Sequence, residues 1–231
     1  MADKLAMTKL VPVRRDKTLG EHVYAQLKGA LMSGAFQPGQ KVSARSVADA
    51  VGVSFTPARE ALSRLIAEGA LETKGPKTVL VPRLTPERLF EITQIRLALE
   101  GLAAEEAGKH VEPSLIEALE ETQLELVAAM DRQDYKTVLS RNEAFHFTLY
   151  SASGMPRLRT IIESLWLAIG PSLNLLYPEF RLTRAGISNH LAVIRALKAG
   201  DAQAARNAIQ KDIEDGFTML SKAVSSLSDV T

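Results

Sequence analysis

The sequence predicts a mainly α-helical protein in which three helices and a β-hairpin, residues 18–84, precede an antiparallel bundle of about six helices, residues 85–231. Three observations support this fold class. Apolar residues recur at helical spacing between start and stop signals over 18–69, the period becomes that of strands over 70–81, and helical spacing then returns and continues to about residue 225.

Each of the three N-terminal helices has its own start and stop signals. The segment 18–34 opens with a Thr-Leu-Gly-Glu capping box and ends at a glycine. The segment 43–52 begins with a serine and also ends at a glycine. Thr56 caps the third helix, Pro57 occupies its first turn, and a glycine follows it.

A short hairpin follows the third helix. Two β-prone runs, 70–73 and 78–81, flank the turn Lys74-Gly-Pro-Lys77, and Val42 can pair briefly as a strand. Three helices with a tight glycine turn between the second and third, followed by a hairpin, form a winged helix-turn-helix.

The region after Thr85 is helical in pattern almost throughout. Proline and glycine residues divide it into segments joined by short connections, which is typical of a compact antiparallel bundle. The helices are expected near 86–109, 113–131, 134–152, 156–173, 179–199 and 201–224.

Charge is distributed unevenly along the 231 residues. Residues 1–84 contain 13 Lys and Arg against 7 Asp and Glu, a charge of +6, whereas 85–231 carry −5, so the chain totals +1. A basic first part, including a flexible basic arm at 1–17, suggests a polyanionic partner, although such a balance also arises by chance.

Composition excludes several classes of protein. With no cysteine, the chain has no disulfide, thiol nucleophile or thiolate metal site. No apolar run approaches the roughly 18 residues that cross a bilayer, and the N-terminus lacks the pattern of a secretory signal. The sequence therefore predicts a cytoplasmic, nucleoid-associated protein without a membrane partner.

The tip of the third helix carries candidate DNA contacts. In a winged helix-turn-helix this end enters the major groove, so Ser54, Thr56 and Arg59 are placed to face base edges and phosphates. Further contacts are expected from the helix before it and from the hairpin turn, at Arg45, Lys74, Gly75 and Lys77. The alternative is that the hydroxyls are only helix caps and the arginines only solvated.

The segment PGQKVSARSVADAVGVSFTPAREALSRLIAEGAL resembles the DNA-binding domain of GntR-family transcription regulators. The helical region resembles the FCD effector-binding domain of that family's FadR/VanR-like branch. The resemblance implies a homodimer, usually a repressor, that binds palindromic operator DNA and responds to a small molecule, often a carboxylate. One position departs from the family pattern, because Phe55 stands where an arginine is usual. Phenylalanine cannot contact guanine bidentately, so Phe55 either meets a thymine methyl or turns inward as packing.

Four polar residues lie on apolar helix stripes in the bundle: Asn142, His146, His190 and Asp212. Such groups are costly to bury unless they meet each other, a metal or a polar ligand. The family resemblance maps them onto a metal site in which aspartate usually stands at Asn142 and histidine at Asp212. The set suits zinc, nickel or manganese. The alternative is a metal-free polar pocket in which Asp212 orients a histidine.

Arg96 is the remaining candidate. It lies on an apolar stripe, and the resemblance implies that it binds the carboxylate of an organic-acid effector, together with Asn142, His146 and His190. The alternative is an intrahelical ion pair with Glu100, one turn further on.

The sequence favours a ligand-responsive transcription regulator over two other functions. A metal-dependent enzyme with an N-terminal interaction module lacks the Glu-x-x-His pairs of di-iron bundles and has no evident base beside the candidate metal site. An architectural DNA-binding protein has no need of a polar pocket in an acidic second domain.

Overall fold

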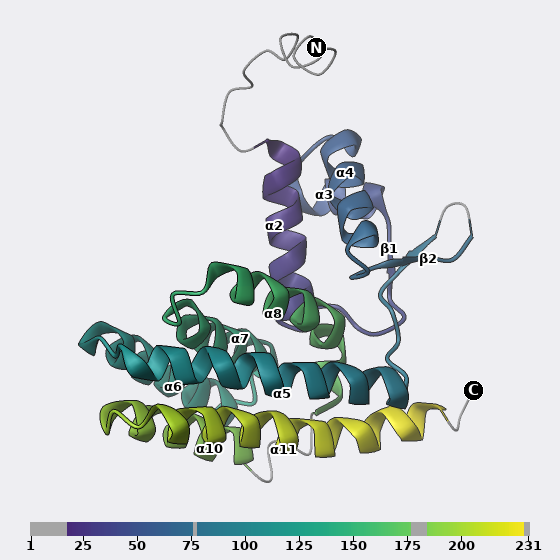
Figure 1. Cartoon of the computed structure of the whole chain (residues 1–231). Coiled ribbons are helices and arrows are strands. Elements are labelled where there is room, and N and C mark those ends of the chain that lie inside the picture. Colours follow the sequence, from purple (N-terminus) through teal and green to yellow (C-terminus); the bar gives the residue numbers. More distant parts are fainter. Residues whose placement is uncertain (1–17, 76–77, 177–183, 229–231) are drawn as a thin grey trace, which may run out of the picture.

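The computed structural model describes residues 18–75, 78–176 and 184–228 and has the predicted mainly α-helical architecture, a winged helix-turn-helix followed by a helical domain (Figure 1). The predicted basic arm at 1–17, Lys77 and the predicted helical residues 179–183 lie outside these ranges.

The winged helix-turn-helix is built from short elements. Its helices and strands are α2 (Leu19–Met32), β1 (Lys41–Val42), α3 (Ala44–Val51), α4 (Phe55–Ala67), β2 (Glu72–Thr73) and β3 (Val79–Leu80). The strands form an antiparallel sheet in the order β1-β3-β2, in which Val79 pairs with both Val42 and Thr73. The predicted pairing of Val42 is therefore confirmed.

The start signals act as the sequence predicts in two of the three N-terminal helices. Thr18 and Ser43 cap α2 and α3 by accepting from backbone amides, each within a capping box. The third differs, because α4 begins at Phe55 with Ser54 as its N-cap and without a side-chain cap hydrogen bond. Thr56 thus lies inside the first turn and its hydroxyl is not the cap that the sequence indicates.

The helical domain contains, within the described ranges, the six predicted helices. They are α5 (Pro86–Lys109), α6 (Pro113–Asp131), α7 (Tyr135–Ser151), α8 (Pro156–Ile169), α10 (Ala185–Lys198) and α11 (Ala202–Ser228). The fourth is shorter than predicted because the chain tightens after Ile169 into a 3-10 helix, η1 (Gly170–Leu176). No helix of the described part is long and apolar enough to span a membrane.

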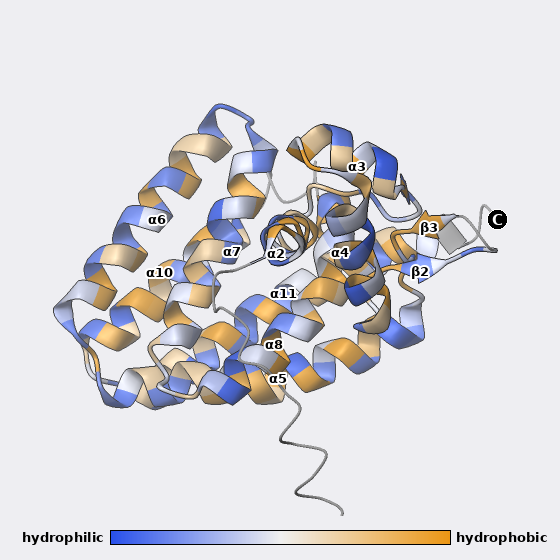
Figure 2. Ribbon diagram, turned by 90° about the horizontal axis from the view of Figure 1, so that it is seen from above, coloured by the Kyte–Doolittle hydropathy of each residue, from blue (hydrophilic) through white to orange (hydrophobic). Residues whose placement is uncertain are grey.

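Two arrangements position the functional residues. The long helices α5 and α11 pack side by side along the base of the molecule (Figure 1). Helix α2 stands on the helical domain, against α8 and η1, and Figure 2 shows it nearly end-on beside α4, with which it packs. A continuous apolar core runs through both domains, from Val23 to Val224.

An ionic cluster joins α2 to the helical domain. The Lys28 Nζ atom lies 2.5 Å from Glu163 Oε2 on α8, and Arg159 holds the other oxygen of Glu163 at 2.9 Å. Glu143 on α7 lies near both Lys28 and Glu163. Burial, together with the charge of Glu163, raises the pKa of Glu143 to about 7, although Lys28 opposes the rise.

The Glu143→Gln variant is expected to be more stable than the wild type at pH 8, by about 1–2 kcal/mol after allowance for partial exposure, but not at pH 5. The pKa of Glu143 is raised above its ordinary value of 4.5, so its stabilising contribution is complete below that value and is lost as the pH rises through about 7. Urea unfolding at both pH values measures the difference. Glu117→Gln, at an exposed position of α6, is the control and should show no such change.

Candidate functional site

The predicted DNA contacts gather on one face of the winged helix-turn-helix. Ser54, the N-cap of α4, is exposed, as are Thr56 and Arg59 on α4 and Arg45 on the first turn of α3. A groove of about 350 Å³ separates these helices from the hairpin, and its lining includes Arg45, Arg59 and Gly75. Lys74 is exposed at the hairpin turn. The groove thus brings together four of the predicted contacts, Arg45, Phe55, Arg59 and Gly75.

Phe55 lies at the first position of α4 with 55% of its surface exposed, beside Arg45 and Arg59 in the lining of the groove. Of the two roles open to it from the sequence, inward packing is therefore wrong. An exposed phenyl ring at the tip of α4 offers an apolar surface where the family pattern has a guanidinium.

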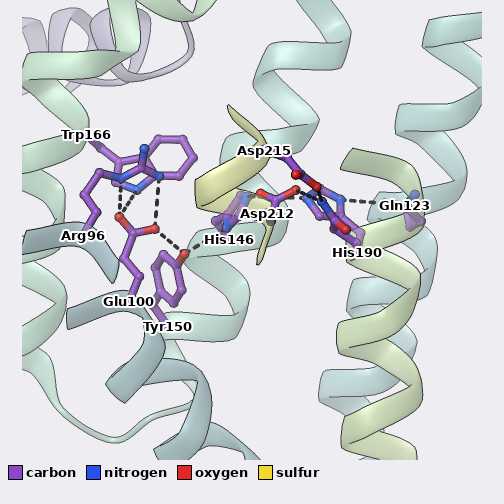
Figure 3. A network of polar contacts seen from close by, with 10 residues as sticks. Arg96, Glu100, Gln123, His146, Tyr150, Trp166, His190, Asp212 and Asp215 are labelled. Atoms are coloured by element: carbon purple, nitrogen blue, oxygen red, sulfur yellow. Dashed lines mark hydrogen bonds and ion pairs between the residues drawn. The ribbon is translucent and has the colours of Figure 1, made fainter. Parts of the chain in front are cut away.

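Three of the four predicted metal ligands converge in the helical domain. Helix α7 provides His146, α10 provides His190 and α11 provides Asp212, and one ligand atom from each lies within 4.8 Å of the other two. The His146 Nε2 atom is 3.3 Å from Asp212 Oδ2 and 3.4 Å from His190 Nε2 (Figure 3). Asn142, one turn before His146, lies on the wall of the adjoining cavities.

Hydrogen bonds on the far side of each imidazole fix its tautomer. The Tyr150 hydroxyl donates to Glu100 Oε2 at 2.5 Å, so its oxygen must accept the proton on His146 Nδ1, which lies 2.9 Å away. The His190 Nδ1 atom donates to Gln123 Oε1 at 2.8 Å. When both rings are neutral, their Nε2 lone pairs face each other and the Asp212 carboxylate.

Burial governs the charges of this cluster. Burial lowers the pKa of His190 to about 3, so this imidazole is neutral. Burial alone would raise the pKa of Asp212, but its hydrogen bond with His146 and the nearby imidazoles hold it below its ordinary value. Where His146 Nε2 carries no proton to donate to Asp212, the carboxylate and the two imidazole lone pairs repel one another unless a cation lies among them. The donor set therefore fits a divalent metal ion, with a proton on His146 as the competing occupant.

Arg96 makes the ion pair that the sequence offered as its alternative role. Its Nε and Nη2 atoms lie 2.5 and 3.2 Å from the two oxygens of Glu100, and its guanidinium also lies over the Trp166 ring. The Trp166 Nε1 atom donates to Glu100 as well, at 3.1 Å. Glu100 and Tyr150 therefore link Arg96 to His146 in one continuous network, as Figure 3 shows.

Two small cavities adjoin this network. One of about 50 Å³ is lined by Arg96, His146 and Asp212, and the other, of about 30 Å³, by His190. Asn142, Leu173 and Leu176 line both. Between them, the two cavities are therefore lined by all five predicted effector and metal residues.

Sequence reasoning missed the residues that hold the histidines in place. Tyr150 follows His146 by four residues, and Gln123 interrupts the apolar stripe of α6 just as the chosen histidines interrupt theirs. The sequence pattern could therefore have identified both Tyr150 and Gln123 as interior polar residues. Neither the pairing of Tyr150 with Glu100 nor that of Gln123 with His190 has a signal in the sequence, because each joins helices that are distant along the chain.

Comparison with known proteins agrees with this architecture. The family model described as bacterial regulatory proteins, gntR family, matches residues 19–81, and the FCD domain model matches residues 91–215. The HTH-type transcriptional regulator McbR of Escherichia coli strain K12 is 32% identical over 196 residues, which cover 84% of this chain and 89% of that protein.

Solved structures give the same result. The structure of E. coli McbR/YncC matches with a TM-score of 0.83 at 31% identity, covering 90% of this chain and 99% of that one. A GntR regulator from Rhodococcus sp. RHA1 matches with a TM-score of 0.71 at 21% identity, covering 87% of this chain and 96% of that one, which shows a shared fold. These relatives and domains are those of transcriptional regulators, not enzymes. The chain belongs to the GntR family of bacterial transcriptional regulators, with an FCD domain after its helix-turn-helix.

Proposed function

We propose that this GntR-family regulator is a repressor that binds a palindromic operator as a homodimer and responds to a small organic acid together with a divalent metal ion. The outward-facing tip of α4 carries the DNA-binding part of the proposal, because Ser54, Thr56 and Arg59 have no partner there in the described part of the chain other than solvent. Two such tips in a two-fold dimer fit successive major grooves of a palindrome.

The individual contacts follow from side-chain chemistry. Arg59 is suited to a base edge or phosphate, Ser54 and Thr56 to phosphates at the helix N-terminus, and Arg45 to the flanking backbone. Gly75 allows the hairpin to approach an adjacent groove, where Lys74 is suited to a phosphate, and Lys77, which lies outside the described residues, stays a predicted phosphate contact. Phe55 removes the guanine contact that an arginine would make at its position.

The Arg59→Ala variant is expected to bind a specific operator about 1–3 kcal/mol more weakly, or roughly 5- to 150-fold. The measurement is fluorescence anisotropy on a duplex selected from random sequences by the wild-type chain, at two salt concentrations. Arg195→Ala, at an exposed position of α10, serves as the matched control. Equal affinity of the wild type and the Arg59→Ala variant would show that α4 does not enter the groove as proposed.

The charges around the cavity couple the acid to the metal. Glu100 already neutralises Arg96, and Asp212 adds a negative charge to the cavity wall. A carboxylate is therefore repelled until a cation binds at His146, His190 and Asp212. A metal held by these three residues would supply that positive charge, and Asn142 and Arg96 would hydrogen-bond the acid.

Organic acids that bind this cavity are expected to raise the thermal midpoint of the protein much more when zinc is present than when it is absent. Linkage requires that such an acid raise the affinity for zinc by the same factor. A thermal-shift screen of small organic acids, with zinc in one arm and a chelator in the other, measures the change in thermal midpoint under both conditions. An acid that stabilises the protein equally in the two arms would place its site away from the three metal ligands.

A further inference from the structure

The 3-10 helix η1 belongs to the ligand cavity on one side and touches the DNA-binding domain on the other. Leu173 and Leu176 line both cavities, and Ile169, the residue before η1, lines the larger one. A ligand that fills these small cavities therefore contacts η1. A short 3-10 segment at the end of an α-helix is a common place for a hinge.

Asn174 lies on the same short helix and holds the end of α2. Its Nδ2 atom donates to the carbonyl oxygens of Gly34 and Phe36, the latter at 3.1 Å, and to Pro171 of its own helix at 3.1 Å. Gly34 and Phe36 directly follow α2, so this amide joins two segments about 140 residues apart in the sequence.

Backbone packing at the same place is equally close. A Cβ atom on Gly170 would lie 2.4 Å from the Leu31 carbonyl oxygen and 2.8 Å from Met32 Cα, so only glycine permits this approach of η1 to α2. Gly34, at φ +67°, would in turn bring a Cβ atom to 3.1 Å from the Gly170 carbonyl oxygen. The end of α2 and η1 therefore fit together without space for independent movement.

Helix α2 carries this connection to the DNA-binding face. It packs along α4, and the Tyr24 hydroxyl donates to Glu68 at the end of α4 with a distance of 2.7 Å. Figure 1 shows α2 beside α4, with the C-terminal end of α2 on the helical domain. A shift of η1 thus moves the end of α2, and α4 moves with α2.

We infer that Asn174 is a positioning residue that transmits occupation of the FCD cavity to α4, through its hydrogen bonds to the end of α2. The inference rests on the proposed function, because it assigns the path by which a cavity ligand alters operator binding. This role of Asn174 has one distinctive consequence. Loss of the Asn174 amide should reduce the effect of cavity occupation on operator affinity, without removing the ability of the cavity to be occupied.

Two probes of cavity occupation make the inference testable while the natural ligand is unidentified. One is zinc alone, titrated against the full chain. The other is the Gly216→Leu substitution, because Gly216 lines the larger cavity and a Cβ atom there meets no atom within 4 Å, so the new side chain has room to enter. Operator affinity is measured for each chain with and without each probe.

In the wild-type background, at least one probe is expected to change operator affinity by about fivefold or more. In the Asn174→Ala background the same probe is expected to change it less than about twofold, while calorimetry shows that zinc still binds. Asn174→Gln retains the amide donor and should restore part of the effect. Asn207→Ala, at an exposed position of α11, is the matched control.

The outcomes separate the inference from the proposed function. If a probe alters operator affinity equally in the wild-type and Asn174→Ala backgrounds, the cavity controls DNA binding but Asn174 does not transmit the signal, and the inference is overturned alone. If neither probe alters operator affinity in the wild type, the coupling itself is absent and both proposals fail. Should Asn174→Ala not fold, the same comparison is made with Asn174→Asp, which lacks the donor at nearly unchanged size.

Discussion

Replacing Glu100 by alanine is expected to lower the free energy of unfolding by about 3–5 kcal/mol, the range for breaking a buried ion pair from one side. Glu100 is fully buried and accepts hydrogen bonds from Arg96, Tyr150 and Trp166. Without its carboxylate, the buried guanidinium of Arg96 keeps its charge but loses its partner. Chemical denaturation of the two proteins measures the loss.

Two controls separate the buried pair from a general effect of removing a glutamate. Glu120 makes an exposed ion pair with Lys198 at 2.6 Å, so Glu120→Ala should cost no more than about 1 kcal/mol. Combining Arg96→Met with Glu100→Leu removes both charges and should recover part of the lost stability. A Glu100→Ala variant as stable as the Glu120→Ala variant would mean that Arg96 finds solvent or another partner.

Local signals in the sequence were sufficient for most of the fold. The capping boxes at Thr18 and Ser43 involve residues three apart, so the start of α2 and α3 can be read directly from the sequence. The start of α4 could not, because two hydroxyl residues one position apart, Ser54 and Thr56 on either side of Phe55, both suit an N-cap. The choice between them depends on the path of the preceding turn.

The candidate site was only partly accessible from the sequence. His146, His190 and Asp212 interrupt apolar stripes, and this periodicity is enough to place them in the interior. Their partners are set by helix packing, which the periodicity of one helix does not contain. For the same reason Asn174, whose acceptors lie near residue 35, has no signal in its own segment.

The fold also explains why Arg96 forms the ion pair with Glu100, which was the alternative to effector binding. Its partner Glu100 is one helical turn away, so the helix itself places the two side chains within reach of each other. Burial then makes the pair permanent in the absence of a ligand. Arg96 can therefore act on an effector only through its remaining N–H groups, not through its net charge.

The largest effect on ligand binding is expected from the metal cluster, where His146→Ala or His190→Ala should weaken zinc binding by at least about 100-fold. The wild-type chain is expected to bind one zinc ion, since two imidazoles and a carboxylate face one another within 4.8 Å. Calorimetry and metal analysis of the purified chain measure the stoichiometry and affinity. His110→Ala is the control, because His110 is exposed and far from the cluster in the sequence.

Two further measurements distinguish a metal site from a polar pocket that only needs a proton. Tyr150→Phe removes the acceptor that fixes the His146 tautomer and should weaken zinc binding about 10- to 100-fold while leaving all three ligands in place. Zinc affinity should fall as the pH falls, because protons compete with the metal for its ligand atoms. If His146→Ala and the wild type bind zinc equally, the ion lies elsewhere, and the pairing of Asp212 with His146 serves only to join α11 to α7.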